Sequence, residues 1–100
     1  MNVHKEKTKK NSKHVFHIFA IMTKKRSQLI RYLRNQKILT GIHYSEPACF
    51  SKGYREFCKF NVKNLKNTIK VSKETLSIPI YPELSNYDMN KIIKIINKFK

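Results

Sequence analysis

The sequence of 100 residues has no tryptophan, two glycines, two cysteines and three prolines. Two glycines leave no glycine-rich loop of the kind that holds a phosphate group through backbone N–H donors. The cysteines, Cys49 and Cys58, match neither a C-x-x-C redox motif nor a zinc-binding pair, and two cysteines cannot form a disulfide framework. We therefore expect reduced, structural thiols and no metal site.

Long apolar runs are also absent. No segment has the 18 or so consecutive apolar residues that a membrane-spanning helix requires, and the first thirteen residues, MNVHKEKTKKNSK, lack the apolar core of a signal peptide. The sequence therefore predicts a cytoplasmic protein with no membrane partner.

Acidic residues are scarce, because six Asp and Glu stand against 22 Lys and Arg and give a net charge of +16. A basic surface binds nucleic acid by releasing counterions from phosphates, so this balance is evidence for such a partner. However, 18 of the 22 are lysines that are spread along the chain together with many asparagines and isoleucines, three residues with A/T-rich codons. A dedicated recognition surface would concentrate its charge and favour arginine, so composition argues against nucleic acid as the main partner.

The N-terminal part divides into a leader and a strand. Residues 1–13 are polar, rich in lysine and without periodicity, which predicts a disordered basic leader. Residues 14–22, HVFHIFAIM, are aromatic and branched, which predicts a strand buried on both faces. His14 and His17 would then point to opposite faces, where they cannot share a metal ion.

A helix is expected next. Thr23 can cap its N-terminus, and Leu29, Ile30 and Leu33 recur at helical spacing on one side. Residues 36–37 are expected to close this helix.

The middle of the chain is less regular. Residues 38–42 predict a short extended segment in which Gly41 allows a close approach. Residues 44–61 predict an irregular loop, whose many aromatic side chains imply that it packs against something. A short helix is expected over 67–75, and a strand over 76–80 that ends against Pro82.

The C-terminal helix has the clearest pattern. Ser85 is the expected N-cap, with Asp88 three residues later in the capping-box position. The expected apolar stripe consists of Met89, Ile92, Ile93, Ile96 and Phe99. Strands and helices therefore alternate, which predicts an α/β or α+β fold with a few-stranded sheet packed against about three helices.

Two segments resemble the C-terminal part of the DegT/DnrJ/StrS family, pyridoxal-phosphate-dependent aminotransferases that act on keto-sugars attached to nucleotides. Residues 13–44, which end in ILTGIHY, resemble the family's strand, helix and HY-containing turn. Residues 70–99, with the string LSIPIYPEL, resemble its closing segment. The resemblance implies that residues 14–100 form the small C-terminal domain of a fold-type I aminotransferase, with the large cofactor-binding domain absent.

The HY turn suggests the site residues. By resemblance, His43 and Tyr44 line the sugar-binding side of the active site in a complete enzyme. The alternatives are a turn histidine with solvated nitrogens for His43 and plain packing for Tyr44. The loop HYSEPACFSKGY keeps Pro47 and Tyr54 of the family pattern HYP-x-P-x-H and Q-P-x-Y, but it replaces other prolines and places Cys49 where the family has histidine.

Catalysis in this family needs a lysine for the Schiff base, an acid on the pyridine nitrogen and donors for the phosphate. Nothing in the sequence matches them, so we expect no catalytic or cofactor-binding residue and no pyridoxal phosphate bound by this chain alone. The resemblance implies two partners, a separately encoded cofactor-binding domain and a second copy, and a nucleotide-sugar substrate in the complete enzyme only. The chain is then a fragment or one half of a split aminotransferase, and the alternative is a small basic module that binds nucleic acid or another polyanion.

Overall fold

The computed structural model describes residues 8–57, 59 and 61–100. Within these ranges it has a two-stranded antiparallel sheet and several helices, which confirms the predicted α+β fold. The elements in chain order are β1 (Phe19–Met22), α1 (Arg26–Asn35), the 3-10 helix η1 (Ala48–Phe50), α2 (Lys52–Arg55), the 3-10 helix η2 (Val62–Leu65), α3 (Lys66–Glu74), β2 (Thr75–Ile78) and α4 (Asn86–Lys98).

The sheet pairs β1, in the first quarter of the chain, with β2, in its last third. Phe19 lies opposite Ile78, and Met22 lies opposite Thr75. On the other side of β2, Gly41 and Ser77 exchange two backbone hydrogen bonds of 2.9 and 2.7 Å. The short extended segment predicted around Gly41 therefore adds to the sheet for a single residue pair.

Both strands are shorter than predicted. The ladder ends at Ile78 because the next residue, Pro79, has no N–H to donate. Residues 14–18 are not strand, because β1 begins at Phe19, and Val15 is 86% exposed. The strand expected from His14, buried on both faces, is therefore wrong in its first half. His14 instead accepts a hydrogen bond at Nδ1 from the N–H of Phe16 (2.8 Å).

The core lies between one face of the sheet and the helices α1 and α4. Leu29 and Leu33 of α1 and Leu76 of β2 have no exposed surface, as the helical spacing in α1 predicts. Gln36 is the C-cap of α1, also as expected. The other buried apolar side chains are Ile21, Ile38, Ile92 and Ile96.

The N-terminal cap of α1 differs from the prediction. The helix begins at Arg26 with Lys25 as N-cap, so Thr23 lies too early to cap it. Thr23 accepts a hydrogen bond at Oγ1 from the N–H of Lys25 (3.1 Å), and its own N–H donates to the carbonyl of Glu74 (3.0 Å). Thr23 thus stabilises the turn between β1 and α1 and joins it to the end of α3.

The predicted cap of α4 is confirmed, but its apolar stripe is partly wrong. The hydroxyl of Ser85 accepts from the N–H of Asp88 (3.0 Å) and donates to Asp88 Oδ2 (2.7 Å). Met89 and Ile93 are exposed, because the buried face of this helix is narrower and turned toward α1. The side chains that face the core are Ile92, Ile95, Ile96 and Phe99.

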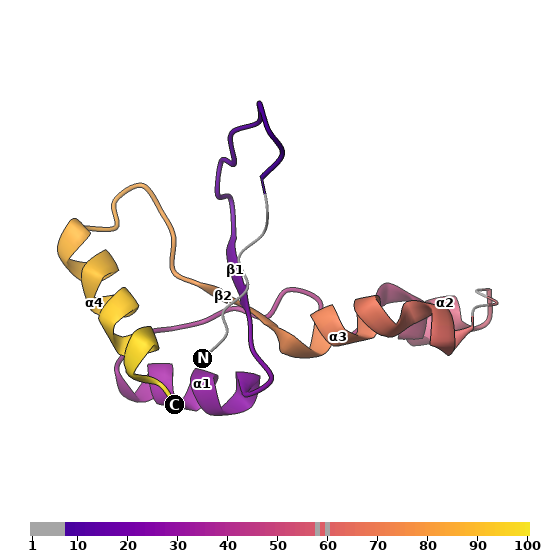
Figure 1. Ribbon diagram of the computed structural model, residues 1–100. Helices are drawn as coiled ribbons and strands as arrows, with labels where there is room; N and C mark the ends of the chain where they lie inside the picture. Colours follow the sequence, from indigo (N-terminus) through magenta and orange to yellow (C-terminus); the bar gives the residue numbers. More distant parts are fainter. Residues whose placement is uncertain (1–7, 58, 60) are drawn as a thin grey trace.

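An arm formed by η1, α2, η2 and α3 extends away from the core (Figure 1). None of these four elements contains a buried residue among those described. The radius of gyration is 16.0 Å, against about 13 Å for a compact domain of this length. The helix expected over 67–75 is confirmed as α3, whereas the loop expected over 44–61 contains two short helical segments.

Residues 1–7 of the predicted leader lie outside the described residues, and residues 8–13 are exposed. No helix in the described part of the chain is both long and apolar enough to cross a lipid bilayer.

Candidate functional site

A groove of about 770 Å³ lies on the sheet, and three segments form it. One precedes and enters β1, one surrounds Gly41, and one is the end of β2 with the residues after it. The lining residues are His17, Ile18, Phe19, Leu39, Thr40, Gly41, Ile42, His43, Tyr44, Ser77, Ile78, Pro79 and Ile80. Both residues predicted to bind substrate, His43 and Tyr44, are among them.

Small residues form the middle of this face. Leu76 points into the core, so Ser77, the next residue of β2, points to the opposite face. Its direct neighbours across the sheet are Ala20 on β1 and Gly41, and paired residues project to the same face. The side chains of Ala20, Ser77 and Gly41 are a methyl group, a hydroxymethyl group and a hydrogen atom. They project only a short distance from the sheet, so the middle of this face is hollow.

His43 folds back over these three residues. A Cβ built on Gly41 would lie 3.3 Å from His43 Nε2, so the imidazole occupies the space that a larger residue would need. His43 is nevertheless exposed. Its ring is thus placed over the sheet and remains open to solvent.

Tyr44 does not pack against the rest of the described chain. Its side chain is 84% exposed. Its backbone has a positive φ of 62°, a conformation that a bulky residue rarely adopts and that costs about 1 kcal/mol or more. Strain of this kind often accompanies a functional position.

Sequence reasoning missed Ser77. Its hydroxyl is buried and has no hydrogen-bond partner among the described residues, and the same is true of the hydroxyl of Thr75 on the same face of β2. An unpaired buried hydroxyl costs about 1–3 kcal/mol. Side chains alternate between the two faces of a strand, so along LSIP (residues 76–79) an inward Leu76 places Ser77 on the opposite face. This alternation is the sequence signal that could have identified Ser77.

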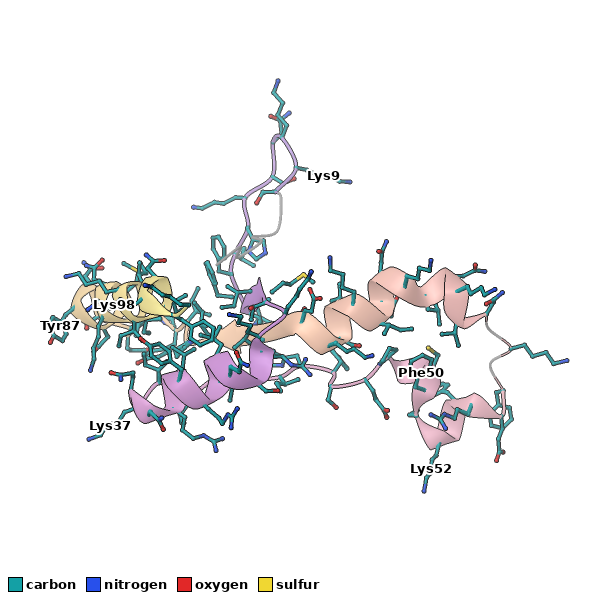
Figure 2. All side chains as sticks on the ribbon, turned by 60° about the horizontal axis from the view of Figure 1, so that its bottom comes forward. Lys9, Lys37, Phe50, Lys52, Tyr87 and Lys98 are labelled. Atoms are coloured by element: carbon teal, nitrogen blue, oxygen red, sulfur yellow. The ribbon has the colours of Figure 1, made fainter. Side chains whose placement is uncertain are left out.

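The groove carries no formal charge. None of its lining residues is Lys, Arg, Asp or Glu, although 28% of the chain is charged. The lysines labelled in Figure 2 lie instead at the periphery: Lys9 near the N-terminal end, Lys37 after α1, Lys52 on the arm and Lys98 at the end of α4. The uncharged lining separates this face from the rest of a strongly basic surface.

A second hollow, of about 410 Å³, lies along α3 and has the opposite character. Its lining residues are Val62, Lys63, Lys66, Ile69, Lys70, Lys73 and Glu74. Lys63 lies on η2, and spacings of four and three residues place Lys66, Lys70 and Lys73 on one side of α3. Charge is therefore more concentrated here than the sequence suggested.

Neither hollow fits pyridoxal phosphate. The groove has no lysine for a Schiff base and no acid for the pyridine nitrogen, and the hollow on α3 has no glycine-rich turn for the phosphate. The described residues also contain no group of three or more His, Cys, Asp or Glu that could hold a metal ion. His14 lies outside the groove that His17 lines.

The aromatic loop predicted over residues 44–61 forms part of the arm, where it contains η1 and α2. Tyr54 and Phe57 are exposed, and Phe50 is half-buried on the arm (Figure 2). Cys49 is a free thiol next to Phe50 in the sequence. The second cysteine of the prediction, Cys58, lies outside the described residues, as does Phe60.

Comparisons with protein families, with individual proteins and with solved structures all point to the same family. The family model of the DegT/DnrJ/EryC1/StrS aminotransferases matches residues 1–97. The dTDP-3-amino-3,6-dideoxy-alpha-D-galactopyranose transaminase of Aneurinibacillus thermoaerophilus is 29% identical over 86 residues, and a pleiotropic regulatory protein of Geobacillus stearothermophilus is 33% identical over 91. Each match covers 86% of this chain and 23% of the relative, so the chain spans about a quarter of the length of these proteins.

Solved structures agree on the fold. DesV of S. venezuelae, in complex with a ketimine intermediate, superposes with a TM-score of 0.87 at 24% identity and covers 96% of this chain and 26% of that one. A DegT DnrJ EryC1 StrS aminotransferase from Brucella abortus superposes with a TM-score of 0.78 at 22% identity, covering 95% and 25%. The small α+β fold predicted from the sequence is thus similar to about a quarter of each of these aminotransferases.

Proposed function

This chain belongs to the DegT/DnrJ/EryC1/StrS aminotransferase family, and we propose that it serves as the small C-terminal domain of a sugar aminotransferase, active only together with a cofactor-bearing domain. Enzymes of the family depend on pyridoxal phosphate. The observation that carries the proposal is the uncharged groove, which gathers His43 and Tyr44 on one open face but offers no residue that could hold the cofactor. The cofactor chemistry then comes from a domain outside these 100 residues.

Within that enzyme, His43 and Tyr44 face the sugar of a nucleotide-linked keto-sugar. An imidazole and a phenol both donate and accept hydrogen bonds, which suits recognition of sugar hydroxyls. Support for this role comes from the exposure of both side chains in the groove and from the strained backbone at Tyr44. The dTDP-amino-sugar transaminase among the relatives makes a dTDP-linked keto-sugar the first substrate to try.

The test is a transamination assay with three samples: the chain with pyridoxal phosphate, the product of the reading frame immediately upstream with pyridoxal phosphate, and the two together. Glutamate is the amino donor, and dTDP-linked keto-sugars are the acceptors. We expect activity only in the combined sample and a loss of at least about tenfold in kcat/KM for His43→Ala, the cost of one missing hydrogen bond to substrate. Activity of the chain alone, or no activity of the combined sample, would refute the proposal.

The lysine face of α3 supports a second candidate function, the binding of nucleic acid or another polyanion. Four lysines around one hollow give a local charge that phosphates can neutralise. If all four contact phosphates, the logarithm of the association constant should fall against the logarithm of salt concentration with a slope of about −3 to −4. Lys66→Glu with Lys70→Glu would then abolish binding, whereas binding that is weak at low salt and unchanged in this double variant would exclude the candidate.

The cytoplasmic location and the second copy of the chain remain part of this proposal. The resemblance to the family implies the second copy. Size-exclusion chromatography with light scattering on the combined sample tests the second copy, and fractionation of the source cells tests the location.

A further inference from the structure

The hollow along η2 and α3 has a local net charge of +3, because four lysines and one glutamate line it. The lysines are Lys63, Lys66, Lys70 and Lys73. All four are exposed, and none of their ammonium groups has a hydrogen bond or ion pair with another described residue. Positive charges on neighbouring turns of one helix repel each other. An anion between them therefore gains attraction from several lysines and relieves this repulsion.

Apolar side chains share this surface with the lysines. Val62 is 55% exposed and Ile69 is half-buried, and both line the hollow. Ile69 follows Lys66 by three residues and precedes Lys73 by four, so one side of α3 presents both apolar and basic groups. The stem of a lysine is itself apolar, and it can lie on an apolar surface while its ammonium group reaches water or phosphate. The hollow thus combines positive charge with a contact surface for hydrocarbon.

The position of this hollow leaves it accessible to a broad partner. It lies on the arm, which extends away from the sheet and from α1 and α4 (Figure 1). Neither η2 nor α3 contains a buried residue among those described. A flat surface can therefore approach α3 without first meeting the helices that cover the core.

Nucleic acid matches the hollow less well. No arginine lines it, so it lacks the planar guanidinium that pairs with phosphate or guanine through two hydrogen bonds. No aromatic side chain lines it either, so no group there can stack on a base. A second copy of the chain is also unsuitable, because two molecules of net charge +16 repel each other.

We infer that the hollow along η2 and α3 binds the surface of a membrane that contains anionic phospholipids. The lysines contact lipid phosphates, and Val62 and Ile69 lie at the boundary between headgroups and acyl chains. Helices with lysines beside apolar side chains bind in this way, in the plane of the interface. The sequence predicted no membrane partner because it lacks a spanning segment, and surface binding does not require one. The inference narrows the second candidate function to one partner and is independent of the aminotransferase role.

Vesicle binding by the intact chain tests the inference. The probes are vesicles of phosphatidylcholine alone and vesicles in which about a third of the lipid is phosphatidylglycerol. Bound protein is measured by sedimentation at physiological salt. Each lysine near an anionic surface raises affinity about fivefold, so we expect the anionic vesicles to bind at least about tenfold more tightly.

A matched pair of double variants tests the location. Lys66→Glu with Lys70→Glu in the hollow, and Lys91→Glu with Lys94→Glu on α4, each lower the net charge by four units at exposed helical positions. We expect the first to weaken binding to anionic vesicles at least about 25-fold, because two lysines are lost, and the second less than about threefold. Circular dichroism confirms that each variant is folded.

Val62→Ser distinguishes a lipid surface from other polyanions. We expect it to weaken binding to anionic vesicles about three- to fivefold, because apolar contact with lipid is lost, and to leave binding to a DNA duplex unchanged. Val71→Ser is its control. Val71 is 48% exposed on α3 but does not line the hollow, so this substitution should change neither affinity.

The outcomes separate the inference from the second candidate function. Loss of vesicle binding in the α3 double variant but not in the α4 double variant, together with the selective effect of Val62→Ser, supports the inference. Binding to DNA but not to anionic vesicles would overturn the inference and leave the second candidate function standing. Equal losses in the two double variants would overturn the inference, because the attraction would then be spread over the chain. Binding to neither probe would overturn both, while the transamination assay still decides the aminotransferase role.

Discussion

The imidazole of His43 lies directly against Gly41, with Nε2 3.3 Å from the position that a Cβ on this glycine would occupy. Gly41 does not have a positive φ, so its backbone would accept alanine. The glycine is therefore needed for space and not for conformation, and the space that it leaves is filled by the proposed substrate-facing ring.

Gly41→Ala should displace the imidazole without unfolding the chain. A contact of 3.3 Å requires the ring to move by a few tenths of an ångström, and an exposed histidine can do so. Alanine also restricts the unfolded chain, so the free energy of unfolding should stay the same or rise by up to about 1 kcal/mol. The ring NMR signals of His43 should shift.

Gly53→Ala is the control for this change. Nothing lies within 4 Å of a Cβ at Gly53, which belongs to α2. It should leave the His43 signals unchanged. Unshifted His43 signals in Gly41→Ala, or a loss of several kcal/mol of stability, would contradict the relationship.

Ser77→Ala should stabilise the isolated chain. The substitution removes a buried hydroxyl that has no partner among the described residues, so unfolding in urea should cost about 1 kcal/mol more. Ser85→Ala is the same chemical change at a satisfied hydroxyl that caps α4, and it should cost about 1 kcal/mol of stability. Destabilisation by both variants would mean that Ser77 has a structural role within the free chain.

Arg26 should hold the arm to the core. Its Nη1 donates to the carbonyls of Ser72 and Thr75 at the end of α3. Arg26→Met keeps the apolar stem but removes these charge-assisted bonds, so we expect a loss of about 1–2 kcal/mol and faster amide exchange over α3. Arg31→Met, at an exposed position of the same helix, should change neither, and equal effects of the two substitutions would refute the role of Arg26.

Local signals predicted the helices better than the strands. The Ser85 cap and the buried leucines of α1 depend on residues within one or two turns, and both were correct. Strand length depends on a partner that is distant in the sequence. Phe19 pairs with Ile78 at a separation of 59, and the proline that limits β1 is the residue after Ile78, 60 positions from Phe19. The strand predicted over 14–22 could not include this constraint.

The candidate site was predicted only in part, because some of its features are local in the sequence and others depend on residues that are far apart in it. His43 and Tyr44 were recognisable because the HY turn is contiguous, and both line the groove. Ser77 was missed because its place in the groove depends on its pairing with Gly41, 36 positions earlier in the sequence. The absence of a side chain on Gly41 leaves the face of the sheet around Ser77 hollow. The uncharged lining combines three segments and is not visible in any one of them.

The strained backbone at Tyr44 gives the last prediction. Tyr44 has a φ of 62° and an 84% exposed side chain, so the chain bears a conformational cost here without gaining contacts. Glycine adopts this conformation freely, and Tyr44→Gly should raise the free energy of unfolding by about 0.5–1 kcal/mol. Tyr81→Gly, at an exposed tyrosine outside the positive-φ region, should lower it by a similar amount, because glycine enlarges the unfolded ensemble.

Activity should change in the opposite direction to stability at Tyr44. If the phenol faces the sugar, kcat/KM of the complex with the cofactor-bearing domain should fall at least about tenfold in Tyr44→Gly while the isolated chain becomes more stable. Tyr81→Gly should leave kcat/KM within about twofold. Glycine preserves the shape of the turn, so a residue that served only this shape could be replaced by glycine without loss of activity. Unchanged activity of Tyr44→Gly would therefore show that Tyr44 does not belong to the site.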